Sequence, residues 1–280
     1  IEAKYGHWNQ EINQWDTALI PVFGGNCIMV IEHTNLRCTM GPGIGKNLTW
    51  TITVHGLYYF QNTAQTSLPK FVEGRYASPT YYSLKLTGKK LCGKDSQKSV
   101  TEGGEQIVIQ GTNFGPTGKI WNIPTVNYGK VVELGQMEQK FYAKNCTVAI
   151  AHVQIECETM AGAGFLHRWE ITVGGQLNVP LPTGYSPPIL TNISGDGASN
   201  ADTNGNQKVL IHGKNFGPPS TVGQKSSFLE SVTYGFIGIE YTAKNCNVLS
   251  HFLIECTTVP GFGTNLKWQV TVAGQVNNML

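Results

Sequence analysis

The sequence has little charge, few aspartates and no long apolar run. Only 14% of its 280 residues are charged and the formal net charge is +2, without a block of like charges, so no nucleic-acid-binding surface is predicted. No apolar stretch approaches the ~20 residues that span a bilayer. The four aspartates do not recur in pairs with glutamate at a spacing suited to acid–base catalysis. We therefore expect no catalytic residue, no cofactor and no membrane span.

The sequence also lacks a sustained helical period with end caps. Its threonines, valines, isoleucines and 33 glycines instead suit turn-rich antiparallel sheet. Strands are expected at 106–110 and 208–212. Turns follow at Asn113-Phe-Gly-Pro and Asn215-Phe-Gly-Pro, where the glycine is free to adopt a positive φ. An all-β protein is predicted.

One pattern occurs three times along the chain. Asn-Cys opens an apolar run that passes a histidine and reaches a second cysteine, and a Gly-x-Gly turn and a tryptophan strand follow. The period, roughly 100 residues, is that of a domain rather than a solenoid repeat. Because a catalytic centre is normally present once, the recurrence indicates architecture. We call the copies repeat one (1–77), repeat two (78–186) and repeat three (187–280). Their tryptophans are the expected core anchors: Trp50, Trp169 and Trp268.

The seven cysteines form three similarly spaced pairs and leave one over. No Cys-x-x-Cys occurs, so disulfides are favoured over a metal or redox site, each contributing ~3 kcal/mol by closing a short loop. The third pair is one residue closer, which predicts a shorter connecting loop or a bulge. The predicted pairs are Cys27 with Cys38, Cys146 with Cys157, and Cys246 with Cys256. Cys92 is either a buried free thiol or bonded to another chain.

Histidines recur between the paired cysteines, at positions 33, 152 and 251. Neither serine nor aspartate recurs beside them, so they are expected to fill a turn rather than act as general bases. Asp202-Thr-Asn204-Gly-Asn206 lacks the glycine and the final carboxylate that an acidic calcium loop requires. A polar loop is therefore expected over 195–207, and no metal site is predicted.

Three sequons, at Asn47, Asn145 and Asn192, are acceptors for N-linked glycans in the secretory pathway. Together with the paired cysteines they predict an oxidising setting, extracellular or at the cell surface. A disulfide at Cys146 would hinder glycan transfer to the neighbouring Asn145. Asn47 and Asn192 are therefore expected to carry glycan more reliably.

These motifs resemble the IPT/TIG domains. The resemblance rests on Gly-x-Asn-Phe-Gly, Tyr-Gly, Asn-Cys, His-x-x-Ile-x-Cys and Gly-x-Gly before the tryptophan strand, and it covers nearly the whole chain. IPT/TIG domains are immunoglobulin-like sandwiches found in plexin-type receptors and in many surface proteins. The resemblance implies three tandem immunoglobulin-like β-sandwich domains in an extracellular protein, and it implies no shared reaction.

The first and last predicted domains are incomplete against this pattern. Tyr5-Gly6 aligns with Tyr128-Gly129, so repeat one lacks its opening strands. Repeat three has no counterpart of Tyr185-Ser-Pro-Pro, the expected closing strand of repeat two. A sandwich without such strands exposes unpaired backbone. Either the chain is a slice of a longer polypeptide, or neighbouring chains supply the strands.

The expected function is that of a non-catalytic structural glycoprotein, a rod or fibril subunit assembled by strand complementation or domain stacking between protomers. Its partners would be other copies of itself, as a homo-polymer, or neighbouring domains of a longer chain. The alternative is the stalk of a receptor or adhesin ectodomain that presents a binding domain absent from this chain. Proline-rich junctions favour stiff connections between the repeats.

Overall fold

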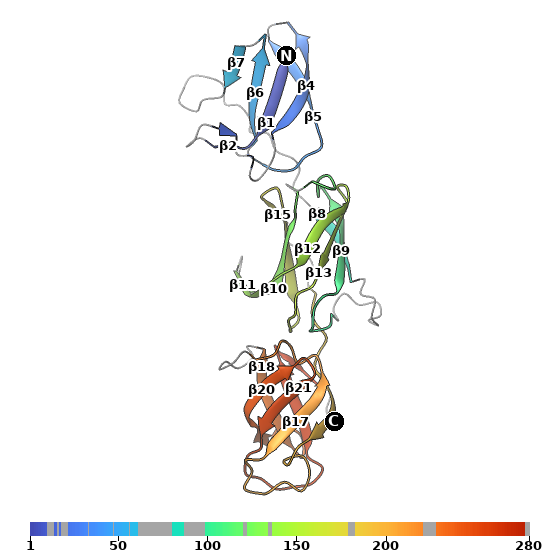
Figure 1. Cartoon of the computed structure of the whole chain (residues 1–280), viewed down its shortest axis with the longest axis vertical. Coiled ribbons are helices and arrows are strands. Elements are labelled where there is room, and N and C mark those ends of the chain that lie inside the picture. Colours follow the sequence, from blue (N-terminus) through green and yellow to red (C-terminus); the bar gives the residue numbers. More distant parts are fainter. Residues whose placement is uncertain are drawn as a thin grey trace.

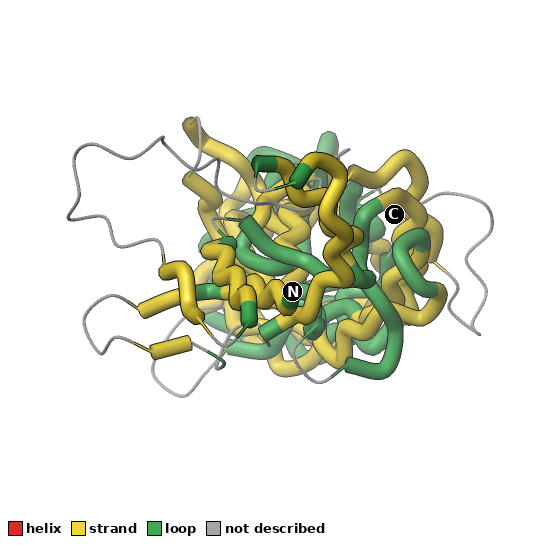
Figure 2. The backbone as a smooth tube through the Cα atoms, turned by 90° about the horizontal axis from the view of Figure 1, so that it is seen from above, coloured by secondary structure: helices red, strands yellow, loops and turns green. Residues whose placement is uncertain are grey.

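The computed structural model describes residues 1–9, 14–15, 17, 22–32, 34–46, 48–55, 57–60, 80–86, 99–119, 122–133, 136–178, 183–220 and 228–277. Every regular secondary-structure element in these ranges is a β-strand (Figure 2), and the named strands pair in antiparallel orientation. The predicted all-β class is confirmed. Within the same ranges no helix is long and apolar enough to cross a membrane. Figure 1 shows three groups of strands that follow one another along the longest axis.

Repeat one contains a single main sheet. Its strands are β1 (Glu2–Gly6), β4 (Phe23–Ile31), β5 (Asn35–Met40), β6 (Thr49–Val54) and β7 (Leu57–Phe60), in the order β5-β4-β1-β6-β7. A separate small hairpin joins β2 (Trp8–Asn9) to β3 (Gln14–Trp15).

Repeat two contains two four-stranded sheets. One has the order β12-β13-β9-β8 and comprises β8 (Thr80–Leu86), β9 (Gln106–Thr112), β12 (Lys144–Ile150) and β13 (Gln154–Glu158). The other has the order β11-β10-β14-β15 and comprises β10 (Thr125–Glu133), β11 (Gln136–Tyr142), β14 (His167–Val173) and β15 (Gln176–Asn178).

Repeat three has the same arrangement. The first sheet, in the order β16-β17-β21-β20, comprises β16 (Ile189–Ser194), β17 (Lys208–Lys214), β20 (Lys244–Ser250) and β21 (Leu253–Thr257). The second, in the order β19-β18-β22-β23, comprises β18 (Leu229–Gly235), β19 (Tyr241–Thr242), β22 (Lys267–Val272) and β23 (Gln275–Val276).

In repeats two and three the two sheets enclose an apolar core. β9 and β17 share one pattern of alternating burial, which places Ile107 and Ile109, or Val209 and Ile211, on the inner face. Residues of both sheets belong to each core. The arrangement is that of a β-sandwich, held mainly by burial of these side chains.

Repeat one has a smaller described core, centred on Tyr5 and Leu48. Among the described strands, its β5 pairs with β4 alone, whereas the corresponding β13 of repeat two also pairs with β9. Because no described strand covers the β4–β5 hairpin, apolar side chains of β4 remain exposed, with Ile28 at 64%. Repeats two and three are therefore the more completely enclosed parts of the described chain.

The tryptophans lie opposite tyrosines in all three repeats. Each ring pair is stacked, with centroids 4.2–4.4 Å apart, and each tyrosine hydroxyl accepts a backbone N–H located three residues after the second cysteine. The pairs are Tyr5 with Trp50, Tyr128 with Trp169, and Tyr234 with Trp268. The repeated sequence pattern therefore encodes one repeated packing unit.

The structure joins the cysteine pairs across neighbouring strands, β4 to β5, β12 to β13 and β20 to β21. The turn that connects the two disulfide-bonded strands spans 151–153 in repeat two and 251–252 in repeat three. The closer spacing of the third pair therefore arises from a turn that is one residue shorter. Cys92 and His33 lie outside the described residues.

The other two recurring histidines support the Asn-Phe-Gly turns through their main chains. The carbonyl of His152 accepts the N–H of Phe114, and that of His251 accepts the N–H of Phe216, both at 3.1 Å. Both phenylalanines are completely buried. The histidine position therefore has a structural role in these two repeats.

The Gly-x-Gly turns connect successive repeats. Ile44, at the centre of the first turn, belongs to the core of repeat two, and Ala163, at the centre of the second, belongs to that of repeat three. Hydrogen bonds accompany this packing, from Gln176 to the carbonyl of Gly45 and from Gln275 to that of Tyr185. The same turn thus contacts the following repeat at both junctions.

Candidate functional site

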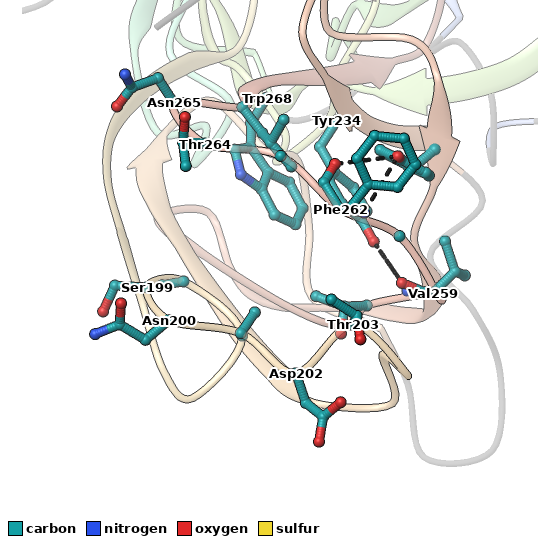
Figure 3. Close-up of a pocket in the computed structure, with 18 residues that line it drawn as sticks. Ser199, Asn200, Asp202, Thr203, Tyr234, Val259, Phe262, Thr264, Asn265 and Trp268 are labelled. Atoms are coloured by element: carbon teal, nitrogen blue, oxygen red, sulfur yellow. Dashed lines mark hydrogen bonds between the residues drawn. The ribbon is translucent and has the colours of Figure 1, made fainter.

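A pocket of about 450 Å³ lies at one end of repeat three. The corresponding end of repeat two is the one that contacts repeat three. Three segments line it: the loop at 197–203, the β18–β19 aromatic pair, and the segment from Thr258 to Trp268 (Figure 3). Its size is within the usual range for small-ligand sites. This pocket is our candidate functional site.

Stacked aromatic rings form one wall of the pocket. Tyr234 packs on Trp268 with centroids 4.4 Å apart, and Tyr241 lies 5.2 Å from Tyr234. The Tyr234 hydroxyl is held between the N–H and the carbonyl of Val259, and burial raises the pKa of this tyrosine. Tyr241 is likewise fixed by the main chain of Phe262. These main-chain hydrogen bonds fix both rings of the wall.

A polar rim faces this wall. Its side chains are hydroxyls, amides and one carboxylate: Ser199, Asn200, Asp202, Thr203, Thr264 and Asn265. Figure 3 shows the members of the 197–203 loop on the side of the pocket opposite Trp268. Asp202 accepts the N–H of Asn204, a local turn that orders the loop. No cluster of three or more metal-ligating side chains occurs within the described ranges, this rim included.

Phe262 projects beside the pocket and is 82% exposed. It is the central residue of the third Gly-x-Gly turn, and its counterparts Ile44 and Ala163 are at most 4% exposed because a following repeat covers them. An exposed aromatic ring at the mouth of a pocket is typical of a binding surface.

In repeat two the equivalent position is not a pocket, because the chain itself fills it. Tyr185 is 2% exposed there, and its hydroxyl bonds both the Tyr128 hydroxyl and the carbonyl of Met160, each at 2.7 Å. Thr183 accepts the indole N–H of Trp169 at 2.7 Å. We call this position the slot, closed in repeat two and open in repeat three.

Main-chain hydrogen bonds hold residues 183–186 in the closed slot. Thr183 and His167 exchange both N–H and carbonyl bonds, at 2.7 and 2.8 Å, and the N–H of Tyr185 donates to Gly164. On the other side, Ser99 receives the N–H of Ser186 and donates to Gly184. The segment is thus an extended strand with partners along both edges.

The scaffold around the slot is the same in repeat three. Thr203 accepts the N–H of Gly261 just as Thr101 accepts that of Gly162, both at 2.9 Å. This correspondence places Ala201, Gly263 and Leu266 of repeat three at the positions of Ser99, Gly164 and His167. Among the described residues, no hydrogen-bond partner is present for the Trp268 indole N–H, the Gly263 carbonyl, or the main-chain groups of Ala201 and Leu266.

The closed slot also buries a histidine. His167 is 3% exposed, stacks on Phe141 and meets the edge of Tyr185, and its Nδ1 has no hydrogen-bond partner in the part of the chain that the structure describes. Burial lowers the pKa of His167 to about 4, so the ring is neutral near pH 7. Leu266 takes its place in repeat three. The two slots therefore differ in a titrating group as well as in occupancy.

The structure brings only some of the sequence-predicted residues to this site. Trp268 lines the pocket, whereas Trp169 lies under the closed slot. The disulfides of these two repeats lie in the sheets that do not contain the tryptophans. Of the predicted glycan acceptors, Asn145 and Asn192 are exposed and Asn47 lies outside the described residues. The amide of Asn145 donates to Glu158.

Sequence reasoning missed three pocket residues, Tyr234, Tyr241 and Phe262, as parts of a site. The sequence carried a signal for Tyr234, because Tyr-Gly recurs in each repeat ahead of the tryptophan strand. It also carried a signal for Phe262, an aromatic residue at the centre of the third Gly-x-Gly turn, where the other copies have Ile and Ala.

No protein-family profile matches the sequence, and no curated protein matches it. Solved structures do match. One is SGBP-B from a complex xyloglucan utilization locus in Bacteroides uniformis, at 15% identity and a TM-score of 0.27, covering 73% of this chain and 48% of that one. Another is a crystal structure with xylogluco-oligosaccharide, at 14% identity and a TM-score of 0.31, covering 91% and 54%. This chain thus spans about half the length of the chains that it matches.

These findings correct the expected function and partners. One of these structures comes from a xyloglucan utilization locus and the other holds a xylogluco-oligosaccharide, and neither is described as a filament subunit, a stalk or an enzyme. The expectations of a rod or fibril subunit, of a homo-polymer and of a receptor stalk are overturned. In physical terms, the two sheets of repeat three bury their core side chains within this chain, so folding of repeat three does not require a strand from another protomer.

Proposed function

We propose that this chain is a non-catalytic ligand-binding protein, extracellular or on a cell surface, and that its ligand site is the pocket of repeat three. The repeats are immunoglobulin-like sandwiches of the IPT/TIG kind with the boundaries 1–77, 78–186 and 187–280. The first lacks opening strands and the third lacks a closing strand within this sequence. N-linked glycans occupy accessible sequons, and the three disulfides suit an oxidising compartment.

One observation supports this function above the others: a pocket with a wall of stacked aromatic rings and a rim of polar side chains lies in repeat three, beside the exposed ring of Phe262. A ligand in this pocket gains both burial against the rings and hydrogen bonds to the rim.

The rim favours carbohydrate as the ligand of this pocket. Amide, hydroxyl and carboxylate side chains can exchange hydrogen bonds with sugar hydroxyls, while an aromatic ring packs on the apolar face of a sugar. Asn200, Asp202 and Asn265 supply the first kind of contact, and Phe262 supplies the second. The matched proteins provide a natural probe, xylogluco-oligosaccharide.

Calorimetric titration of the chain with xylogluco-oligosaccharide tests the proposed function. We expect saturable binding, and weaker binding to Trp268→Phe. Phe236→Ala is the matched control, because Phe236 is 76% exposed in the same repeat but does not line the pocket. Absence of binding to the unaltered chain would refute the function.

A further inference from the structure

Two pieces of repeat two form its junction with repeat three: the turn at 162–164 and the segment 183–186, which we call the closing segment. Ala163, at the centre of the turn, is buried in the core of repeat three. The closing segment is separated from strand β16 of repeat three by Pro187 and Pro188 alone, so it is also the covalent connection between the repeats. Its attachment therefore determines how firmly the two repeats are joined.

Repeat three contacts this connection directly. The side-chain amide of Gln275 donates to the carbonyl of Tyr185 at 3.0 Å, and that of Asn215 donates to the carbonyl of Pro187 at 2.9 Å. Because so few residues link the repeats, release of the closing segment would leave repeat three on a longer and looser connection.

His167 contacts both pieces of the junction. Its main chain exchanges two hydrogen bonds with Thr183, and its ring meets the edge of the Tyr185 ring at a centroid distance of 5.5 Å. A Cβ added to Gly164 would lie 2.9 Å from the Nε2 of His167, so the ring is also packed against the turn. The closing segment and the turn therefore share one supporting side chain.

The surroundings of this ring suit a neutral imidazole. Besides Tyr185, it packs against Phe141 on β11 and Tyr128 on β10, and burial raises the pKa of both tyrosines, so neither supplies a negative charge. An imidazolium has two N–H donors and a positive charge, and burying it without partners for both is costly. The Nδ1 atom has no hydrogen-bond partner among the described residues. Protonation of His167 therefore requires the ring to reach water.

The charged groups around His167 do not offset this cost. Lys130 lies opposite it on β10 and Arg168 follows it on β14, and both are cations. The carboxylate of Glu105 accepts the N–H of Val100 and acts on the pKa of the two tyrosines. Burial, and not a neighbouring charge, accordingly dominates the pKa of His167.

The junction between repeats one and two has an apolar residue at the same position. Leu48 precedes the stacked tryptophan by two residues, as His167 does in repeat two, and it is buried. Ile44 of the preceding turn enters the core of repeat two just as Ala163 enters that of repeat three. The two junctions therefore share one arrangement, and only the second has a titrating group at this position.

We infer that the closing segment is a pH-sensitive latch between repeats two and three, held near neutral pH and increasingly released in mildly acidic medium as His167 takes up a proton. In the held state burial lowers the pKa of His167 from 6.5 to about 4. The released state, in which the ring reaches water, therefore binds the proton more readily, and the held state loses its advantage as the pH falls from 6.5 toward 4. Between pH 7.5 and 5.5 this linkage shifts the equilibrium toward release by about tenfold.

Hydrogen exchange of the full chain, followed by heteronuclear NMR at pH 7.5 and 5.5, tests the latch. The main-chain amides of Thr183 and Tyr185 report release from repeat two, and the side-chain amide of Gln275 reports loss of the contact from repeat three. After correction for the intrinsic pH dependence of exchange, we expect the protection of all three to fall about tenfold. At both pH values they should be less protected than the amides of β9, because release does not require unfolding of repeat two.

His167→Leu is the decisive variant, since leucine occupies this position in repeat one, and it should abolish the pH dependence of exchange in the closing segment. His251→Gln is the matched control. His251 belongs to the same junction, where its Nδ1 lies 3.0 Å from the hydroxyl oxygen of Thr101, and burial lowers its pKa while Glu102 raises it. Because His251 does not hold the closing segment, this variant should keep the tenfold change.

A titration of the ring resonances in the unaltered chain needs no variant, and it should find His167 largely unprotonated at pH 5.5. Half-protonation of this ring at pH 6.5 would overturn the inference, and so would a pH response that persists in His167→Leu. Equal protection of the closing segment and β9 would also overturn it, because the segment would then open only when the repeat unfolds. None of these outcomes bears on saccharide binding, since neither His167 nor the closing segment lines the pocket.

Discussion

Repeats two and three share strand order, core tyrosine–tryptophan stack and disulfide position, yet one slot is closed and the other is open. Tyr185 fills the first, while the second is a pocket of about 450 Å³. Because the scaffold is constant, the comparison isolates what residues 183–186 add to repeat two, while the core side chains of repeat three are buried without such a segment among its described residues.

The largest expected effect comes from emptying the closed slot. Tyr185→Ala removes a buried ring and two hydrogen bonds, so we expect repeat two to lose about 3–5 kcal/mol of unfolding free energy. Chemical denaturation of the full chain measures this loss. Tyr142→Ala is the matched control, because Tyr142 is 58% exposed and should change the stability by less than ~0.5 kcal/mol. Equal effects of the two changes would remove the basis of the comparison.

The second prediction concerns pH. Burial lowers the pKa of His167 to about 4, below its usual 6.5, so the unfolded state binds the proton more readily in this interval. Stability contributed by the neutral ring is complete above pH 6.5 and is lost as the pH falls toward 4, by up to about 3 kcal/mol. Denaturation midpoints of repeat two at pH 7.5 and 4.5 should show this loss.

His167→Leu, which copies Leu266 of repeat three, is the control for the pH effect. It should flatten the pH dependence of repeat two over the same interval, because the only change in titration is at this ring. An unchanged pH dependence in the variant would place the titrating group elsewhere.

The third prediction compares the two tryptophans. Trp169→Phe breaks a 2.7 Å bond to Thr183 and leaves that hydroxyl buried, whereas Trp268→Phe removes an N–H without a described partner. We therefore expect Trp169→Phe to cost about 1–2 kcal/mol more than Trp268→Phe in denaturation experiments. Identical costs would indicate that the two indole groups have equivalent surroundings.

The smallest effect is expected at the mouth of the open slot. Phe262→Ala and Phe236→Ala remove rings that are 82% and 76% exposed, so each should change the unfolding free energy by less than ~0.5 kcal/mol. Only Phe262→Ala should alter ligand binding. A large stability loss on Phe262→Ala would mean that this ring is buried in solution.

Much of the fold followed from local sequence signals. Alternating apolar residues at 107–109 and 209–211 indicated strands, and the Tyr-Gly and tryptophan motifs marked two strands that lie side by side in every repeat. The slot did not follow, because it depends on contacts between residues distant in sequence, such as Tyr185 with Tyr128. Whether such a position is filled or open is a tertiary property without a local pattern.

The expected function was wrong for a related reason. The incomplete pattern around repeats one and three left two explanations open, a slice of a longer polypeptide or strands supplied by other protomers, and the expected fibril followed from the second. Burial of side chains such as Val209 and Ile254 instead encloses the core of repeat three within the described residues. Counting strands identifies an open edge, and only the packed structure shows that the edge borders a pocket.

Exchange of the two indole protons tests the central comparison most directly. In a heteronuclear NMR spectrum of the full chain in deuterated water, the account predicts a protected indole N–H for Trp169 and a rapidly exchanging one for Trp268 that becomes protected when a slot ligand is added. Equal protection of both protons before any ligand is added would contradict the open slot.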